Sequence, residues 1–301
     1  MVRQVRTALV DAFTDEPLTG NAAGVVPDAD GLSASQMQAV ARELAVSETA
    51  FLLPSGPADR KVRYFTPTQE VDLCGHATIA AHAFLRDDGA IDAGEHTLET
   101  EVGVLDVDVE DDGTVWMTQD DPSVRRVDVE YDRLAEALDV PVGSLQDIGA
   151  DLPLAVASTG LPFLMVPVNF LEHVGNADPD LAAVEAICDE VDATGLYLFT
   201  FDALDGDATL HARMFAPGAG VPEDPVTGTA SGAAGAYLRE VSAFDGELPD
   251  EMAFEQGHYL DRPGRVRVRV GESVRVGGEG VLALDGTLSV PADDEDEILE
   301  A

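Results

Sequence analysis

The sequence predicts an α+β protein of two similar halves, each a sheet curled around a central helix. The first observation is a repeat: the pattern Arg-x-Phe-x-Pro occurs at residues 63–67 and returns at residues 213–217. The second is a pair of stretches, residues 77–85 and 230–238, that are apolar or small on nearly every face. A helix without a polar face is buried on all sides. Small side chains let strands pack closely around such a helix, so we expect each half to wrap one of them.

The repeat continues beyond this pattern with a change of spacing. The two patterns lie 150 positions apart, whereas Gly75-His76 and Gly228-Thr229 lie 153 positions apart. The second half therefore carries a three-residue insertion ahead of its helix. The alternative explanation is chance similarity between two stretches rich in glycine and alanine.

The elements of the first half follow from their apolar patterns. Residues 5–13 alternate between buried and exposed types, as in a strand. Ser33 or Ser35 can cap a helix that runs to about Val46. A short apolar run occupies residues 22–26. Further strands are expected at residues 50–53, 61–65, 98–106, 105–109 and 115–118, and helices at residues 77–85 and 129–138.

The second half repeats this order of elements. Strands are expected at residues 154–157, 163–167, 196–201, 208–215, 266–270, 273–276 and 281–284, and helices at residues 179–188 and 231–238. We assign residues 1–120, joined by residues 285–301, to the N-terminal half. Residues 121–284 form the C-terminal half.

The charge of the chain is extreme. Asp and Glu number 58 against 17 Lys and Arg, which gives a formal net charge of −41. Such a surface repels nucleic acid and anionic lipid. The acids are spread along the whole chain, and dispersed carboxylates keep a protein soluble where salt screens ordinary repulsion. We therefore expect a halophilic protein from a salt-rich cytoplasm; the alternative is an acidic surface for a partner.

Several classes of protein are disfavoured. The most apolar stretch, residues 152–168, is broken by glycine and proline, so no membrane span is expected. Residues 1–10 carry two arginines and no long apolar run, so no signal peptide is predicted. Cys74 and Cys188 are too few for a secreted disulfide scaffold or a zinc signature. We expect a cytoplasmic protein with no nucleic-acid or membrane partner, no metal and no cofactor.

Each buried helix begins with a glycine and a polar residue, Gly75-His76 and Gly228-Thr229. A helix N-terminus offers backbone N–H groups and a partial positive charge, and glycine lets a ligand come close. Two such ends can cradle a carboxylate or a developing enolate. The alternative is ordinary helix capping.

Three side chains are candidates for proton transfer. Glu48 stands directly ahead of an apolar strand, and partial burial prepares a carboxyl group to take and give a proton. His76 can hold or relay a proton, and Asp224 precedes the second helix in a stiff loop between prolines. The alternatives are a solvated surface acid for Glu48, a helix cap for His76 and a turn acid for Asp224.

Motifs that come in one order along nearly the whole chain resemble the PhzF (phenazine-biosynthesis-like) family. They occupy residues 11–14 with 20–24, 47–51, 65–67 with 74–78, 158–163, 223–230, and 255–257 with 262–263. The resemblance implies a diaminopimelate-epimerase-like fold, in which each half is a curled antiparallel β-sheet or barrel around a central α-helix. It also implies a homodimer with its site in the cleft between the halves.

The resemblance also implies roles for individual residues. The acid/base glutamate of the family falls on Glu48, and its other site residues fall on His76, Asp224, Gly75 and Gly228. A hydroxyl that the family usually takes from serine falls on Thr229.

Cys74 is a candidate nucleophile at a helix N-terminus. The related epimerases use two cysteines. Cys74 matches one of them, but Thr227 stands at the other position, which favours the PhzF branch over two-base racemisation.

We therefore expect a cofactor-independent isomerase that moves a proton on a small anionic, carboxylate-bearing substrate. Glu48 would remove the proton from carbon and return it at another position, while His76 and Asp224 orient the substrate. The alternatives are an amino-acid epimerase or racemase, and a non-catalytic ligand-binding protein of the same fold. The joint presence of Glu48, His76 and Asp224 argues against the non-catalytic protein.

Overall fold

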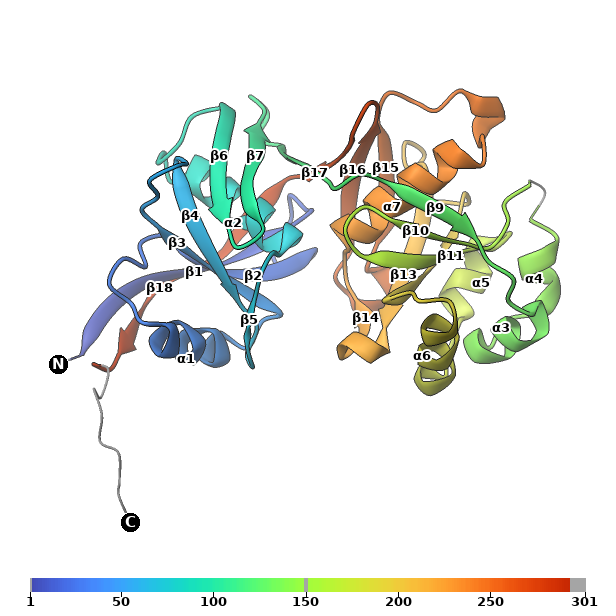
Figure 1. The fold of residues 1–301 in the computed structure, drawn as a ribbon, viewed down its shortest axis with the longest axis horizontal. Coiled ribbons are helices and arrows are strands. Elements are labelled where there is room, and N and C mark those ends of the chain that lie inside the picture. Colours follow the sequence, from blue (N-terminus) through green and yellow to red (C-terminus); the bar gives the residue numbers. More distant parts are fainter. Residues whose placement is uncertain (1, 149–150, 293–301) are drawn as a thin grey trace, which may run out of the picture. The chain divides into compact units, whose positions relative to one another are not determined.

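The computed structural model describes residues 2–148 and 151–292, and it shows an α+β chain that divides into two compact units (Figure 1). Unit 1 comprises Met1–Leu18, Ala22–Val115 and Glu279–Ala301, and unit 2 comprises Thr19–Asn21 and Trp116–Gly278. Residues 293–301, which the sequence analysis assigns to the N-terminal half, lie outside the described residues.

Unit 1 contains two helices and most of the strands from the first half of the chain, together with the last strand. The strands are β1 (Arg3–Ala12), β2 (Asn21–Val26, whose first residue belongs to unit 2), β3 (Glu48–Leu53), β4 (Arg60–Phe65), β5 (Glu70–Val71), β6 (Gly94–Thr100), β7 (Gly103–Val109) and β18 (Gly280–Val290), and the helices are α1 (Ala34–Leu44) and α2 (Gly75–Asp87).

Helix α2 forms the centre of unit 1. Its residues from Ala77 to Leu85 are all buried, and it packs against β1, β3 and β18. Helix α1 covers another part of the sheet and buries Met37 in an apolar cluster with Phe51. Ser33 is the N-cap of α1, where its hydroxyl accepts from the Gln36 N–H, so the first of the two expected caps is confirmed.

Unit 2 contains the remaining elements. Its strands are β8 (Val115–Thr118, beginning at the last residue of unit 1), β9 (Ser123–Arg126), β10 (Ala155–Ser158), β11 (Pro162–Pro167), β12 (Gly195–Thr200), β13 (Leu210–Ala216), β14 (Val221–Asp224), β15 (Met252–Gln256), β16 (Gly264–Val270) and β17 (Val274–Gly278). Its helices are α3 (Tyr131–Leu138), α4 (Val142–Gln146), α5 (Leu171–Asn176), α6 (Leu181–Glu190) and α7 (Gly228–Glu240), with 3₁₀ turns at Pro217–Ala219, Phe244–Gly246 and His258–Leu260.

Helix α7 is the counterpart of α2 in unit 2. Its residues from Ala230 to Leu238 are buried, and it packs against β9, β10, β11, β16 and β17. Helices α3, α4 and α6 bury a second apolar cluster against the strands from β10 to β13. The expected pair of buried helices, one in each half, is confirmed.

The sheets mix antiparallel and parallel pairs, and the parallel pairs follow the repeat. Antiparallel neighbours include β3 with β4 and β12 with β13. Parallel neighbours are β2 with β3 and β4 with β6 in unit 1, and β11 with β12 and β13 with β15 in unit 2. Parallel strands need a crossover connection, and each of these connections contains a helix. Over the described residues the sheet does not close into a barrel.

The repeated pattern makes the same contacts in both units. Arg63 pairs through two hydrogen bonds with Glu70 and lies 5.1 Å from the Phe65 ring centroid. Arg213 pairs in the same way with Glu223 and lies 4.9 Å from the Phe215 ring centroid. The longer connection in unit 2 holds the 3₁₀ turn Pro217–Ala219, which accounts for the three-residue insertion.

One expected strand is wrong. Residues 98–106 form no single strand, because β6 ends at Thr100 and β7 begins at Gly103. Gly103 has φ 131°, a conformation that glycine adopts without strain, and the Thr100 hydroxyl donates to the Gly103 carbonyl oxygen. These two residues close a tight hairpin between β6 and β7.

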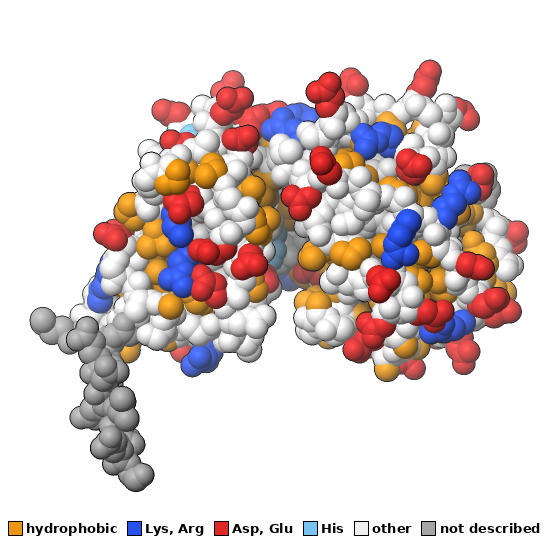
Figure 2. Space-filling view, viewed as in Figure 1, with side chains coloured by type: hydrophobic (Ala, Val, Ile, Leu, Met, Phe, Trp, Pro, Cys, Tyr) orange, Lys and Arg blue, Asp and Glu red, His pale blue; other side chains and the backbone are white. Residues whose placement is uncertain are grey.

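Acidic side chains are scattered over the visible face of each unit, among fewer basic ones (Figure 2). Arg6 and Arg265 each contact two carboxylates: Arg6 lies 2.8 Å from both Asp88 and Asp285, and Arg265 pairs with two aspartates of unit 2. In the part of the chain that the structure describes, no helix is long and apolar enough to cross a membrane.

Candidate active site

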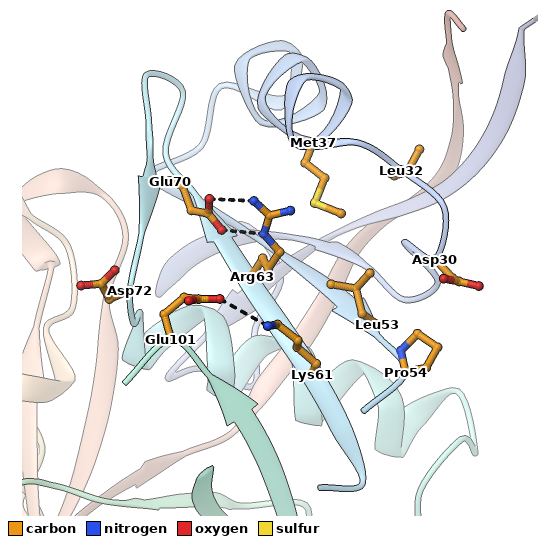
Figure 3. Close-up of a pocket in the computed structure, with 10 residues that line it drawn as sticks. All are labelled: Asp30, Leu32, Met37, Leu53, Pro54, Lys61, Arg63, Glu70, Asp72 and Glu101. Atoms are coloured by element: carbon orange, nitrogen blue, oxygen red, sulfur yellow. Dashed lines mark hydrogen bonds and ion pairs between the residues drawn. The ribbon is translucent and has the colours of Figure 1, made fainter. Parts of the chain in front are cut away.

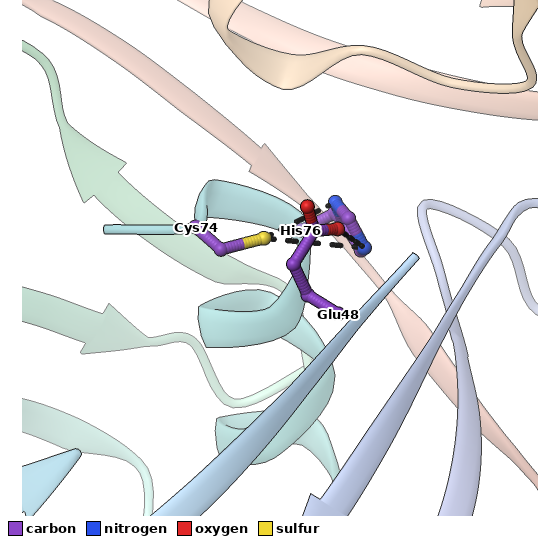
Figure 4. Close-up of side chains that lie close together, drawn as sticks. All are labelled: Glu48, Cys74 and His76. Atoms are coloured by element: carbon purple, nitrogen blue, oxygen red, sulfur yellow. Dashed lines mark hydrogen bonds and ion pairs between the residues drawn. The ribbon is translucent and has the colours of Figure 1, made fainter. Parts of the chain in front are cut away.

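In unit 1, the start of strand β3 meets the start of helix α2, and polar side chains gather there (Figure 4). Glu48 is the first residue of β3, and its Oε2 lies 3.4 Å from the Nε2 atom of His76. The Cys74 Sγ atom lies 3.4 Å from the other imidazole nitrogen, Nδ1. The Glu48 side chain is 22% exposed and that of His76 is 11% exposed. A ligand can therefore reach a carboxylate that is largely removed from water.

Hydrogen bonds of buried residues fix the N-terminus of α2, while the space beyond Gly75 is open. Cys74 is the N-cap residue, but its side chain makes no capping hydrogen bond. A Cβ atom added at Gly75 would meet no heavy atom within 4 Å. Behind this turn, the Thr78 hydroxyl donates to the Cys74 carbonyl oxygen and lies 2.5 Å from the Tyr64 hydroxyl. The first-turn N–H groups are thus positioned for an anion.

Tyr64 and Thr78 are buried, and they support the cluster without reacting. Burial raises the pKa of Tyr64 far above its usual range, so its hydroxyl stays neutral. Unit 2 has a similar pair, in which the buried Tyr197 hydroxyl lies 3.3 Å from the Ser231 hydroxyl at the equivalent position of α7. Each buried helix is therefore held near its start by a tyrosine from a neighbouring strand.

In unit 2, Asp224 ends strand β14 just before helix α7. Its Oδ1 accepts a hydrogen bond from the Asn21 side-chain amide, and its Oδ2 accepts one from the Thr227 hydroxyl at 2.5 Å. The Gln256 side-chain amide donates to the Asp224 carbonyl oxygen. Because two neutral donors fix its carboxylate, Asp224 is held as an acceptor with one orientation.

Helix α7 also begins without a side-chain cap, although Gly228 itself is buried. Thr227 is the N-cap, and its hydroxyl donates to Asp224 instead of capping the helix. Gly228 is the first helical residue and Thr229 the second, the same positions that Gly75 and His76 hold in α2. Within the described residues the Thr229 hydroxyl has no hydrogen-bond partner, while the Thr229 carbonyl oxygen accepts from Thr159. Thr229 thus has a donor to offer a ligand.

The structure brings the predicted residues together as two groups, each within its own unit. Glu48, Gly75 and His76 form the group of unit 1, and Asp224, Gly228 and Thr229 that of unit 2. Cys74, which the sequence singled out as a possible nucleophile, belongs to the first group.

Three partners of these groups were missed by the sequence reasoning. The Ser47 hydroxyl lies 3.1 Å from His76 Nε2, and Asn21 and Gln256 hold Asp224 and its loop. All three stand inside the motifs that resemble the PhzF family, so a polar residue in each motif was the available clue.

A separate hollow of unit 1 does not include the candidate residues (Figure 3). Its cavity volume is about 690 Å³, and Lys61 and Arg63 of β4 lie in it. Both cations are already paired with carboxylates: Lys61 with Glu101, and Arg63 with Glu70. Leu53, at the opposite end of β3 from Glu48, lines it too.

The similarity of the chain to known proteins shows its family. The model of the phenazine biosynthesis-like protein family, PhzC-PhzF, matches residues 10–286. The chain belongs to this PhzF family. A protein of Clostridium acetobutylicum described as an uncharacterized isomerase is 35% identical, over 96% of this chain and 99% of its own. This PhzF-family chain is thus an isomerase.

Two further relatives show how far the likeness extends. The crystal structure of a PhzF-family phenazine biosynthesis protein of Bacillus anthracis superposes with a TM-score of 0.86 at 32% identity, covering 95% of this chain and 99% of that one. The trans-2,3-dihydro-3-hydroxyanthranilate isomerase of Pseudomonas chlororaphis is 31% identical, over 93% of this chain and 98% of its own. The likeness therefore spans both units.

Proposed function

We propose that this PhzF-family isomerase shifts a proton on a small carboxylate-bearing substrate without a cofactor, with Glu48 as the acid/base. The observation that carries the proposal is the pairing of a partly exposed carboxylate with an open, glycine-led helix N-terminus in one unit. A base beside an anion-binding helix end is the combination that carbon deprotonation requires.

The proposed reaction conserves atoms and electrons. The Glu48 carboxylate takes a proton from a carbon atom, and the electron pair left behind delocalises toward the substrate carboxylate. The N–H groups at the start of α2 stabilise the negative charge that develops there. Protonated Glu48 then returns the proton at another carbon, which yields an isomer and restores the enzyme.

His76 and the residues of unit 2 complete the proposal. His76 lies 3.4 Å from Glu48 and can orient its carboxylate or bind a polar group of the substrate. Asp224, Gly228 and Thr229 are proposed substrate-binding residues of unit 2, Asp224 as a fixed acceptor and Thr229 as a hydroxyl donor. The relative from P. chlororaphis is named for trans-2,3-dihydro-3-hydroxyanthranilate, a hydroxylated cyclic carboxylate. We propose a similar hydroxylated cyclic carboxylate as the substrate of this chain.

The test of this function is the Glu48→Gln variant. Glutamine keeps the size of the side chain and removes the base, so we expect a loss of about a hundredfold or more in isomerisation with little change in folding. The measurement is hydrogen exchange at the substrate carbon in deuterated buffer, with trans-2,3-dihydro-3-hydroxyanthranilate as the first compound tried.

Glu43→Gln is the matched control, because Glu43 is an exposed acid on helix α1. The control should exchange at the wild-type rate. Exchange at the wild-type rate by Glu48→Gln would remove Glu48 from the mechanism.

A second pair of variants tests whether Thr229 of unit 2 binds substrate. Thr229→Val removes a hydroxyl donor at nearly constant volume, and a lost hydrogen bond to substrate costs about 1 kcal/mol, or about fivefold in affinity. We expect KM to rise by about that factor in Thr229→Val and to recover in Thr229→Ser. Equal kinetics for valine and serine at this position would show that the hydroxyl contacts no substrate.

A further inference from the structure

The group at the start of α2 contains three side chains of types that bind transition metals. Glu48, Cys74 and His76 each offer one ligand atom, and these atoms all lie within 4.8 Å of one another (Figure 4). We propose that this group is a binding site for Zn²⁺ and similar thiophilic cations, and that the bound ion inhibits the isomerase. The inhibition rests on the proposed role of Glu48, whereas the binding does not.

The distances fit a tetrahedral ion after a small adjustment. Zinc bonds of about 2.0–2.3 Å to nitrogen, oxygen and sulfur place neighbouring ligand atoms about 3.3–3.6 Å apart. His76 Nε2 lies 3.4 Å from Glu48 Oε2 and 4.0 Å from Cys74 Sγ. The Cys74 and Glu48 ligand atoms lie within 4.8 Å of each other. Side-chain movements of Cys74 and Glu48 of up to about 1 Å therefore bring the three ligand atoms to three corners of a tetrahedron.

The backbone holds the three ligands in place for an ion. Cys74 and His76 stand two residues apart at the start of a buried helix, and Glu48 begins a strand that packs against that helix. Thiolate, carboxylate and neutral imidazole together carry two negative charges, which a divalent cation balances. Binding requires the Cys74 thiol to release its proton to solvent, so the affinity should rise with pH.

The thiolate and imidazole ligands of the site favour Zn²⁺ over Mg²⁺ and Ca²⁺, the cations that the acidic surface attracts. Mg²⁺ and Ca²⁺ prefer oxygen ligands, and the acidic surface of this chain offers many. Thiolate and imidazole favour Zn²⁺ and softer ions instead. With three protein ligands, the fourth position stays open to water or to the substrate. An ion that occupies Glu48 withdraws the carboxylate from proton transfer.

Cadmium is the probe, because its bond to a thiolate produces an ultraviolet charge-transfer band. The reduced full-length protein is titrated with Cd²⁺ under excess Mg²⁺, in a potassium salt other than chloride, since chloride competes for Cd²⁺. We expect one equivalent to saturate the band in the wild type and in Cys188→Ser, whose cysteine is buried in the core of unit 2. The band should be absent from Cys74→Ser, and His76→Gln should weaken Cd²⁺ binding tenfold or more.

Three results would overturn the site: no band in the wild type, a band that persists in Cys74→Ser, or a band lost equally in Cys188→Ser. For the inhibition, Zn²⁺ should abolish exchange at the substrate carbon at the concentration that displaces Cd²⁺, and EDTA should restore it. Full activity at saturation would overturn the inhibitory role. Failure of the proposed function would give a different result, in which the metal-free enzyme catalyses no exchange while the Cd²⁺ band still develops. That result would confirm the metal site and contradict its regulatory role.

Discussion

Two histidines of helix α2 differ in burial: His76 can be reached by a ligand, and His82 is enclosed in the core. His76 lies at the N-terminal turn beside Glu48, where a ligand can reach it. His82 lies within the same helix and is only 2% exposed, and its Nδ1–H donates to the Thr78 carbonyl oxygen. Burial lowers the pKa of His82 to about 4, so this imidazole is neutral in the folded protein and serves packing.

The buried imidazole predicts a loss of stability in mild acid. Between the unfolded pKa of about 6.5 and the folded pKa of about 4, the unfolded chain binds the extra proton, which costs about 1.4 kcal/mol per pH unit. Unit 1 of the wild type should therefore lose about 2 kcal/mol more than His82→Gln between about pH 7.5 and pH 5. Hydrogen exchange of the α2 amides measures this, because Trp116, the single tryptophan, belongs to unit 2.

His96→Gln, which removes the neighbouring and partly exposed imidazole, is the matched control. Parallel pH profiles for wild type and His82→Gln would show that His82 does not set the acid sensitivity.

The two central helices use glycine for different reasons. In α7, a Cβ atom added at Gly235 would lie 2.7 Å from Val268 Cγ1 and 3.0 Å from Val270 Cγ2, so strand β16 packs directly on the helix backbone. In α2, the space beyond Gly75 is open. Packing inside the chain explains Gly235, whereas the approach of a ligand is the proposed reason for Gly75.

The contrast predicts that a change from glycine to alanine lowers the free energy of unfolding at position 235 but not at position 75. Gly235→Ala forces about 1–3 kcal/mol of overpacking against a gain of about 1 kcal/mol in helix propensity, so unit 2 should lose about 1 kcal/mol. Gly75→Ala should leave stability unchanged and reduce the isomerase rate. Urea unfolding followed by Trp116 fluorescence reports unit 2, and circular dichroism covers both variants. Equal stability changes in the two variants would contradict this account of the glycines.

At the scale of the whole molecule, the excess of carboxylates dominates. A net charge of −41 repels itself in the compact state, and the described ion pairs engage only some of the acids. Added salt shortens the screening length from about 10 Å at 0.1 M to about 3 Å at 1 M. Folding should therefore depend on salt far more than in a protein of balanced charge.

The salt dependence is tested by thermal melts at increasing potassium chloride. We expect Tm to rise through the molar range, and the isomerase rate at a fixed temperature to fall when salt is removed. Potassium glutamate is a useful second salt, since an increase common to both salts reflects screening. A Tm that stays flat or falls with added salt would contradict the halophilic interpretation.

The sequence was informative wherever a local pattern has one physical solution. Helices that are apolar all round must be buried, and the repeat of Arg, Phe and Pro led to equivalent ion pairs in both units. The sequence was uninformative where the local structure depends on contacts between particular residues. The hairpin at Thr100 and Gly103 depends on one hydroxyl contact and one positive φ angle, and the hydrophobic pattern of the sequence reveals neither.

The sequence by itself determined the α+β class, the two buried helices and the residue types at their starts, because burial and helix-end chemistry follow from the order of residues along the chain. Only the tertiary structure decided which side chains meet. Glu48 and His76 are far apart in sequence and become neighbours through the packing of β3 on α2. Ser47, Cys74 and Asn21 acquired their partners in the same way, because a hydrogen bond depends on distances that only the packed units set.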